Sequence, residues 1–272
     1  MRRVSWGMAT LATAAALLGA VPAPTPAPVP ESGDPWVAPR ILGGTGVPDG
    51  GRVPDGARAP DENRASAVGG KDRKPPAKAP TLAFLAEQGG LWRTAVPHDA
   101  GGHLRTVPGA VAAPHEAERV VTVRVEVETG LGVDGREFAR QVMDTLNDPR
   151  GWGHDGSVVF ARTDGEADVD LTLASPATTD ELCAPVDTGG TVSCGRVGYA
   201  VLNAVRWAQG AEPFLEAGGT VAEYRHYLVN HEVGHVIGYG HVGCPAPGEP
   251  APVMVQQTLG LGGCLPNGWP AG

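Results

Sequence analysis

The eleven residues HEVGHVIGYGH, at positions 231–241, constrain the fold of this chain more than any other stretch. His231 and His235 are four residues apart, so on a helix their rings project from the same side, one turn apart. Gly238 can end that helix, because glycine adopts the left-handed backbone conformation without a steric penalty, and the chain can then return with His241. The pattern therefore predicts a metal site built on the last turns of a helix and on the segment that follows it.

Three imidazole nitrogens are suitable ligands for Zn²⁺, and three protein ligands leave one tetrahedral position open, as in catalytic zinc sites. Glu232 directly follows the first ligand and would lie beside the cation, where a general base is needed. The alternative is a set of hydrogen-bonded core histidines, but three imidazoles buried together without a cation are difficult to satisfy. We expect Zn²⁺ to be the cofactor, with ligands His231, His235 and His241 and with Glu232 as the catalytic base.

Period-two alternation predicts the strands of the domain. Residues 119–130 alternate valine with polar side chains, as a half-buried strand does. Further strands are predicted at 157–163, 166–175 and 198–203. The last of these could be a sheet edge that pairs with an extended substrate, or an ordinary strand paired on both sides.

Capping signals predict two main helices. Asp134 and Glu137 have the spacing of a capping box and precede an amphipathic stretch that stops before Pro149. Thr220 and Glu223 have the same spacing, so the helix that carries the histidines should begin at Val221. The order of strands and helices indicates an α+β domain with an α/β-like first part and a mixed, twisted sheet.

The first 80 residues differ from the rest of the chain. Residues 1–21 begin MRR and continue with an uncharged apolar run at 4–21, which predicts a signal peptide or a membrane anchor. Residues 22–80 hold 13 of the 26 prolines and are expected to form a disordered spacer. Residues 81–272 are expected to form one domain, with its core at about 119–272. Their 11 arginines and 23 acidic residues give a net charge of −12, which argues against nucleic acid as a partner.

The four cysteines are Cys183, Cys194, Cys244 and Cys264. An even number in an exported chain suggests disulfides, and the simplest of the three connectivities pairs 183 with 194 and 244 with 264. A four-cysteine zinc site is the competing interpretation, although the usual Cys-x-x-Cys pairs are absent.

The motif HExxHxxGxxH resembles that of the metzincin clan of zinc peptidases. The resemblance implies a metzincin-like fold with an active-site helix and a methionine-containing turn beneath the metal, for which Met254 is the candidate. Residues 80–272 are also similar to an uncharacterised metzincin-like family of secreted bacterial proteins, through NDPRGW, LASPATTDELC, LNAVRW, YRHYLVNHEVGH and GCLPNGWP. Gln256 stands where some metzincins have a tyrosine, so a tyrosine-assisted mechanism is not expected.

The sequence as a whole predicts a zinc metalloendopeptidase that acts on protein or peptide, with Glu232 as its base. We expect a monomer that is secreted or extracytoplasmic, either released or anchored to a membrane by residues 4–21. The alternative is a zinc-binding module of metzincin shape without efficient proteolysis, with a binding or envelope-associated role. Hydrolysis of a non-peptide amide, such as a cell-wall crosslink, is a third hypothesis.

Overall fold

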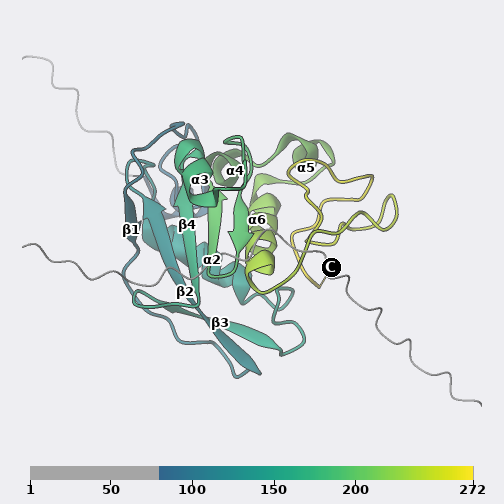
Figure 1. Cartoon of the computed structure of the whole chain (residues 1–272), viewed down its shortest axis with the longest axis horizontal. Coiled ribbons are helices and arrows are strands. Elements are labelled where there is room, and N and C mark those ends of the chain that lie inside the picture. Colours follow the sequence, from purple (N-terminus) through teal and green to yellow (C-terminus); the bar gives the residue numbers. More distant parts are fainter. Residues whose placement is uncertain (1–79, 272) are drawn as a thin grey trace, which may run out of the picture. The chain divides into compact units, whose positions relative to one another are not determined.

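A six-stranded mixed sheet lies at the centre of the part of the chain that the computed structural model describes, residues 80–271 (Figure 1). Its strands are β1 (Leu104–Thr106), β2 (Arg119–Glu128), β3 (Val158–Thr163), β4 (Val169–Ala174), β5 (Cys194–Arg196) and β6 (Tyr199–Asn203). Their order is β1-β2-β4-β6-β5, and β3 pairs with the first half of β2. β2, β3, β4 and β6 pair in parallel, whereas β1 and β5 are antiparallel. The expected α+β class is confirmed. The predicted leader and most of the predicted spacer, residues 1–79, lie outside the described residues.

The strand at 198–203 is paired on both sides, so the interpretation of it as a sheet edge is wrong. β6 pairs with β4 on one side and with β5 on the other. The edge is β5, which has only three residues and no apolar alternation.

The helices are α1 (Leu82–Glu87), α2 (Gly135–Leu146), α3 (Pro176–Cys183), α4 (Ala204–Gln209), α5 (Glu212–Glu216) and α6 (Val221–Val236). The predicted capping box of α6 is confirmed, since Thr220 and Glu223 each accept a hydrogen bond from the other's backbone N–H. At α2 only half of the prediction is right. Asp134 caps the helix through its side chain, but its own N–H donates to Gly90 O, and Glu137 pairs with Arg140 instead.

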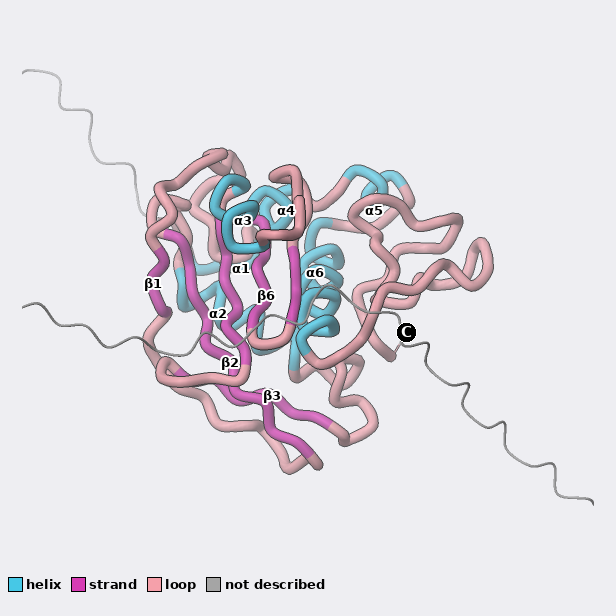
Figure 2. The backbone as a smooth tube through the Cα atoms, in the orientation of Figure 1, coloured by secondary structure: helices cyan, strands magenta, loops and turns pink. Residues whose placement is uncertain are grey.

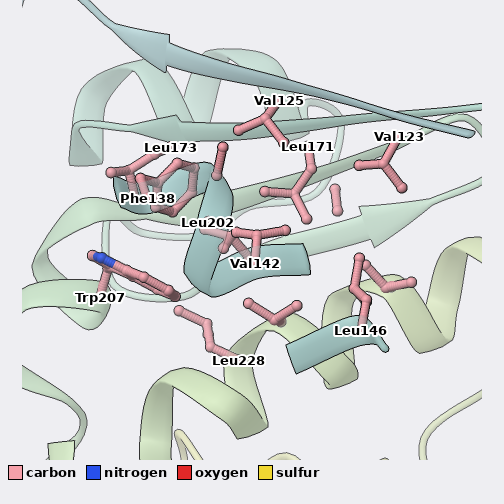
Figure 3. Close-up of a cluster of buried hydrophobic side chains, with 14 of the residues drawn as sticks. Val123, Val125, Phe138, Val142, Leu146, Leu171, Leu173, Leu202, Trp207 and Leu228 are labelled. Atoms are coloured by element: carbon pink, nitrogen blue, oxygen red, sulfur yellow. The ribbon is translucent and has the colours of Figure 1, made fainter. Parts of the chain in front are cut away.

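The main core lies between one face of the sheet and the helices α2, α4 and α6. Figure 3 shows the side chains of α2 meeting those of β2, β4 and β6. Val123, Phe138 and Leu171 are completely buried there. On the opposite face of β2, Arg124 forms ion pairs with Glu126 and Asp170. The alternation that predicted β2 thus separates a buried face from a polar one.

The start of the described chain is fixed to α4 and α6 by a buried arginine. Arg225 of α6 donates from Nε to Trp207 O at 2.8 Å and from Nη1 to Glu87 O at 2.7 Å. Trp207 in turn donates its Nε1–H to Gly89 O at 2.8 Å. Burial lowers the pKa of Arg225 to about 10, so the guanidinium is still charged at neutral pH. No carboxylate pairs with this guanidinium among the described residues, and backbone carbonyls stabilise its charge.

The segment after α6 has no helix and no strand, and it runs as a loop beside that helix (Figure 2). The disulfide Cys244–Cys264 closes most of it, and Asn230 of α6 donates to Gly268 O at 2.8 Å near its end. A second disulfide joins Cys183 to Cys194, at the end of α3 and the start of β5. Both predicted pairings are confirmed, and the four-cysteine zinc site is therefore ruled out.

No helix within residues 80–271 is long and apolar enough to cross a membrane.

Candidate metal centre

The three histidines of the motif converge at the end of α6. His231 and His235 lie on its last two turns, and His241 follows on the loop. The Nε2 atom of His241 lies 3.2 Å from Nε2 of His231 and 3.0 Å from Nε2 of His235. In a tetrahedral zinc site with Zn–N bonds of about 2.0–2.1 Å, two ligand nitrogens are about 3.3 Å apart. The spacing of the three rings therefore fits one small cation.

Backbone carbonyls set the tautomers of two of these rings. The Nδ1–H of His231 donates to Val253 O at 2.8 Å, and that of His235 donates to Tyr239 O, also at 2.8 Å. A carbonyl can only accept, so each Nδ1 carries the proton and each Nε2 presents a lone pair. Burial lowers the pKa of His231 to about 3 and lowers the pKa values of His235 and His241 as well. Two neutral rings thus present Nε2 lone pairs toward Nε2 of His241, and the three nitrogens could together hold a metal ion.

The end of α6 brings the third ring back toward the first two. Gly238 has φ +107°, in the region that favours glycine. Its N–H donates to His235 O, and the N–H of Tyr239 donates to Gly234 O, which is the Schellman pattern of a helix end. The predicted role of Gly238 is confirmed.

A tight turn at residues 252–255 supports the centre from the other side. The N–H of Val255 donates to Pro252 O at 2.9 Å, and the N–H of Val242, next to the third histidine, donates to Met254 O at 3.2 Å. Met254 is buried and packs against Gly234 of α6, where an added Cβ would lie 2.5 Å from its Sδ. Adjacent carbonyls of this turn thus accept from the ring of His231 and from the backbone beside His241.

Glu232 follows His231 in α6 and is buried, and no described residue contacts its carboxyl group by a hydrogen bond. Without a cation, burial raises the pKa of Glu232 to about 8, and a cation held nearby would lower this pKa and favour the carboxylate. Its backbone is packed against the edge strand, because a Cβ added at Gly195 of β5 would lie only 2.1 Å from Glu232 O. A buried carboxyl without a protein partner is costly unless a ligand or water completes it.

A depression of about 380 Å³ opens next to His241. Val242, Val255, Leu259 and Leu261 contribute apolar side chains to its lining, together with the backbone of the glycine-rich turn that follows. The candidate centre is therefore bordered by an open depression with apolar side chains in its lining.

Another histidine of α6, His226, lies outside this group. His226 is half-buried, hydrogen-bonded to Thr145 Oγ1 at 2.9 Å, and its ring lies 4.5 Å from that of Trp269. Within residues 80–271, the three histidines of the motif are the only group of three or more potential ligands that could hold a metal ion. Sequence reasoning did not find the carbonyls of Val253 and Tyr239, since a backbone acceptor leaves no mark on residue identity.

Comparison with known proteins adds a family and no activity. No curated protein and no solved structure matches the chain. One family, described as "Protein of unknown function (DUF3152)", matches residues 92–263, which include α6, the three histidines and the turn at Met254. The chain belongs to this DUF3152 family.

Proposed function

We propose that this protein is an exported, zinc-dependent peptidase of metzincin-like architecture that hydrolyses peptide bonds with Glu232 as general base. The observation that carries the proposal is the convergence of three imidazoles at the end of α6, where Glu232, buried and without a hydrogen-bond partner among the described residues, directly follows the first of them. Holding a cation would not by itself require a carboxyl at position 232. Hydrolysis by an activated water does require a base beside the metal.

Zinc is the metal that best suits this donor set. Neutral imidazoles are preferred ligands of Zn²⁺, and the three nitrogens leave one tetrahedral position open. The Nδ1–H bonds to Val253 O and Tyr239 O are the outer-shell contacts that orient ligand rings in such sites.

The residues of the centre would divide the reaction between them. His231, His235 and His241 would hold Zn²⁺, which would supply Lewis acidity that lowers the pKa of water toward neutrality and polarises a peptide carbonyl. Glu232 accepts a proton from the attacking water at a carboxylate oxygen and then donates it to the leaving amine nitrogen. The carboxyl is available for both transfers because no described side chain or backbone N–H engages it.

Two surfaces beside the centre suit an extended peptide. β5 is the last strand of the sheet, and it touches α6 at Glu232, so its outer edge offers backbone groups close to the site. The apolar depression next to His241 could accept a substrate side chain.

The metzincin-like assignment is supported by the turn at Met254, which packs against Gly234 of α6. Its carbonyls accept hydrogen bonds from the ring of His231 and from the N–H of Val242, the residue after His241. Export is supported by the two disulfides, which persist in oxidising compartments. The sequence of residues 1–21, which we interpret as a signal peptide or membrane anchor, also supports export.

The test compares metal content and cleavage. The purified chain, Glu232→Gln and a control, Glu249→Gln, are analysed for zinc and incubated with a mixed peptide library. Glu249 is exposed in the C-terminal segment, so its change leaves the centre intact. We expect about one zinc per chain in all three, and a loss of cleavage of roughly 10²–10⁴-fold only in Glu232→Gln, the range for general acid–base catalysis.

Two outcomes would overturn the proposal. Equal cleavage by the original chain and Glu232→Gln rules out the proposed base. Stoichiometric zinc without cleavage by any of the three proteins favours a zinc-binding module over a peptidase.

A further inference from the structure

The acceptor of His235 is the least supported part of the candidate centre. Val253 O, which accepts from His231, belongs to a buried turn. Tyr239 O, which accepts from His235, belongs to an exposed loop between two glycines, Gly238 and Gly240. Tyr239 itself is 52% exposed. The N–H of Tyr239 is held by Gly234 O at the helix end, but no described backbone N–H donates to its carbonyl, so a contact of its side chain is what can fix that carbonyl further.

Trp152 provides that contact from a distant part of the sequence. Its ring stacks on the ring of Tyr239, with centroids 4.3 Å apart and planes 23° from parallel. Its Nε1–H donates to Asn230 O of α6 at 2.9 Å. The side chain is only 8% exposed, and an added Cβ at Gly234 would lie 2.7 Å from its Cζ2. The hydrogen bond of its Nε1–H therefore fixes Trp152 to α6, while one face of its ring stacks on Tyr239.

These contacts form one chain of interactions that ends at a metal ligand. We propose that Trp152 is a positioning residue for His235: by stacking on Tyr239 it holds the backbone carbonyl that receives the Nδ1–H of that histidine. The inference rests on the proposed metal site and adds to it a residue that lies 83 positions before His235 and outside the motif. An aromatic stack is a suitable clamp, because two large rings in contact restrict a loop that its glycines would leave free.

The experiment measures metal affinity rather than activity. The full chain, with its disulfides intact, is stripped of metal and titrated with Zn²⁺ in competition with a chromophoric chelator. It is also loaded with Co²⁺, whose visible absorption reports ligand geometry. The variants are Trp152→Leu, Tyr239→Ala, their combination and Tyr239→Phe. Tyr239→Ala keeps the carbonyl and removes only the stacking ring, whereas Tyr239→Phe keeps the stack.

We expect Trp152→Leu and Tyr239→Ala each to weaken Zn²⁺ binding by roughly 10-fold or more, as for other outer-shell contacts, and to alter the Co²⁺ spectrum. The double variant should be no weaker than the worse single one, because both changes break the same link. Tyr239→Phe should bind like the original chain. Phe160→Leu, a truncation of a buried ring in β3, should lower thermal stability without changing metal affinity.

Failure of the inference is distinguishable from failure of the proposed function. If the original chain takes up neither Zn²⁺ nor Co²⁺ stoichiometrically, the metal site itself is wrong. Undiminished affinity and an unchanged Co²⁺ spectrum in Tyr239→Ala would overturn the role of Trp152 while leaving the site in place. Because Tyr239 is exposed, this variant decides the question even if Trp152→Leu does not fold.

Discussion

Gly195→Ala is the most direct test of how the sheet edge is fitted to the helix of the candidate centre. An added Cβ would lie 2.1 Å from Glu232 O, 2.8 Å from its carbonyl carbon and 3.0 Å from its Cα. All three are backbone atoms in the interior of α6, so none can turn aside as a flexible side chain would. Gly195 does not have a positive φ, so alanine is otherwise compatible with its backbone.

The expected loss of stability follows from these contacts. Overpacking a well-filled site costs about 1–3 kcal/mol, and a clash with rigid backbone belongs at the upper end of that range. Replacing glycine also restricts the unfolded chain, which returns about 0.4–1 kcal/mol. We therefore expect a net loss of about 2 kcal/mol, or about 4–8 °C in melting temperature for a domain of this size.

The assay is thermal unfolding followed by circular dichroism, with Gly165→Ala as the matched control. At Gly165 the nearest atom to an added Cβ is Thr163 Oγ1 at 3.6 Å, an ordinary contact, so that variant should melt within about 2 °C of the original chain. Amide hydrogen exchange over residues 194–203 should increase only in Gly195→Ala, because β5 must move away from α6. A Gly195→Ala protein that melts with the original chain would refute the close approach of β5 to Glu232.

Three further predictions concern the C-terminal segment, His226 and the metal. Replacing both Cys244 and Cys264 by serine should lower the free energy of unfolding by about 3 kcal/mol, because a loop of 20 residues is no longer closed, and should weaken Zn²⁺ binding. Thermal unfolding and zinc titration measure the two effects, and unchanged values in both would contradict this prediction. Burial lowers the pKa of His226, so its contribution to stability is present above the unfolded pKa of about 6.5 and is lost as the pH falls through the folded value. The stability of the original chain relative to His226→Gln should therefore decrease between pH 7.5 and pH 5 in urea unfolding, and a constant difference would count against this reasoning. Removing metal with a chelator should lower the melting temperature by roughly 10 °C, because free Zn²⁺ at about 1,000 times its dissociation constant contributes about 4 kcal/mol to the free energy of unfolding. Adding Zn²⁺ back should restore the melting temperature.

Local patterns predicted the longer helices and strands and the convergence of the three histidines. β2 and α6 follow from period-two alternation and from a capping box, because their own residues determine their geometry. The four short helices α1, α3, α4 and α5 have five to eight residues each, too few for a period to be recognised. α4 is held to the turn that follows α1 by the Nε1–H of Trp207, which donates to Gly89 O, and no local pattern contains this contact.

The candidate centre was predictable only in its innermost layer. His231, His235 and His241 lie within eleven residues, so spacing alone brings them together. Val253 accepts through its backbone, and Trp152 acts from 78 residues before Asn230, so neither could be inferred from residue types. The sequence left open whether residues 198–203 form the sheet edge, because Cys194–Arg196 becomes a strand only through its pairing with β6 and its contact with α6.

The buried guanidinium of Arg225 bears on where a recombinant fragment can begin and stop. A fragment cut to the family match, residues 92–263, would lack Glu87, whose carbonyl accepts from Arg225, and Gly89, whose carbonyl accepts from Trp207. It would also stop one residue before Cys264, so Cys244 would have no cysteine with which to form its disulfide. Losing the partner of a buried charge costs several kcal/mol, so expression boundaries should enclose residues 80–271.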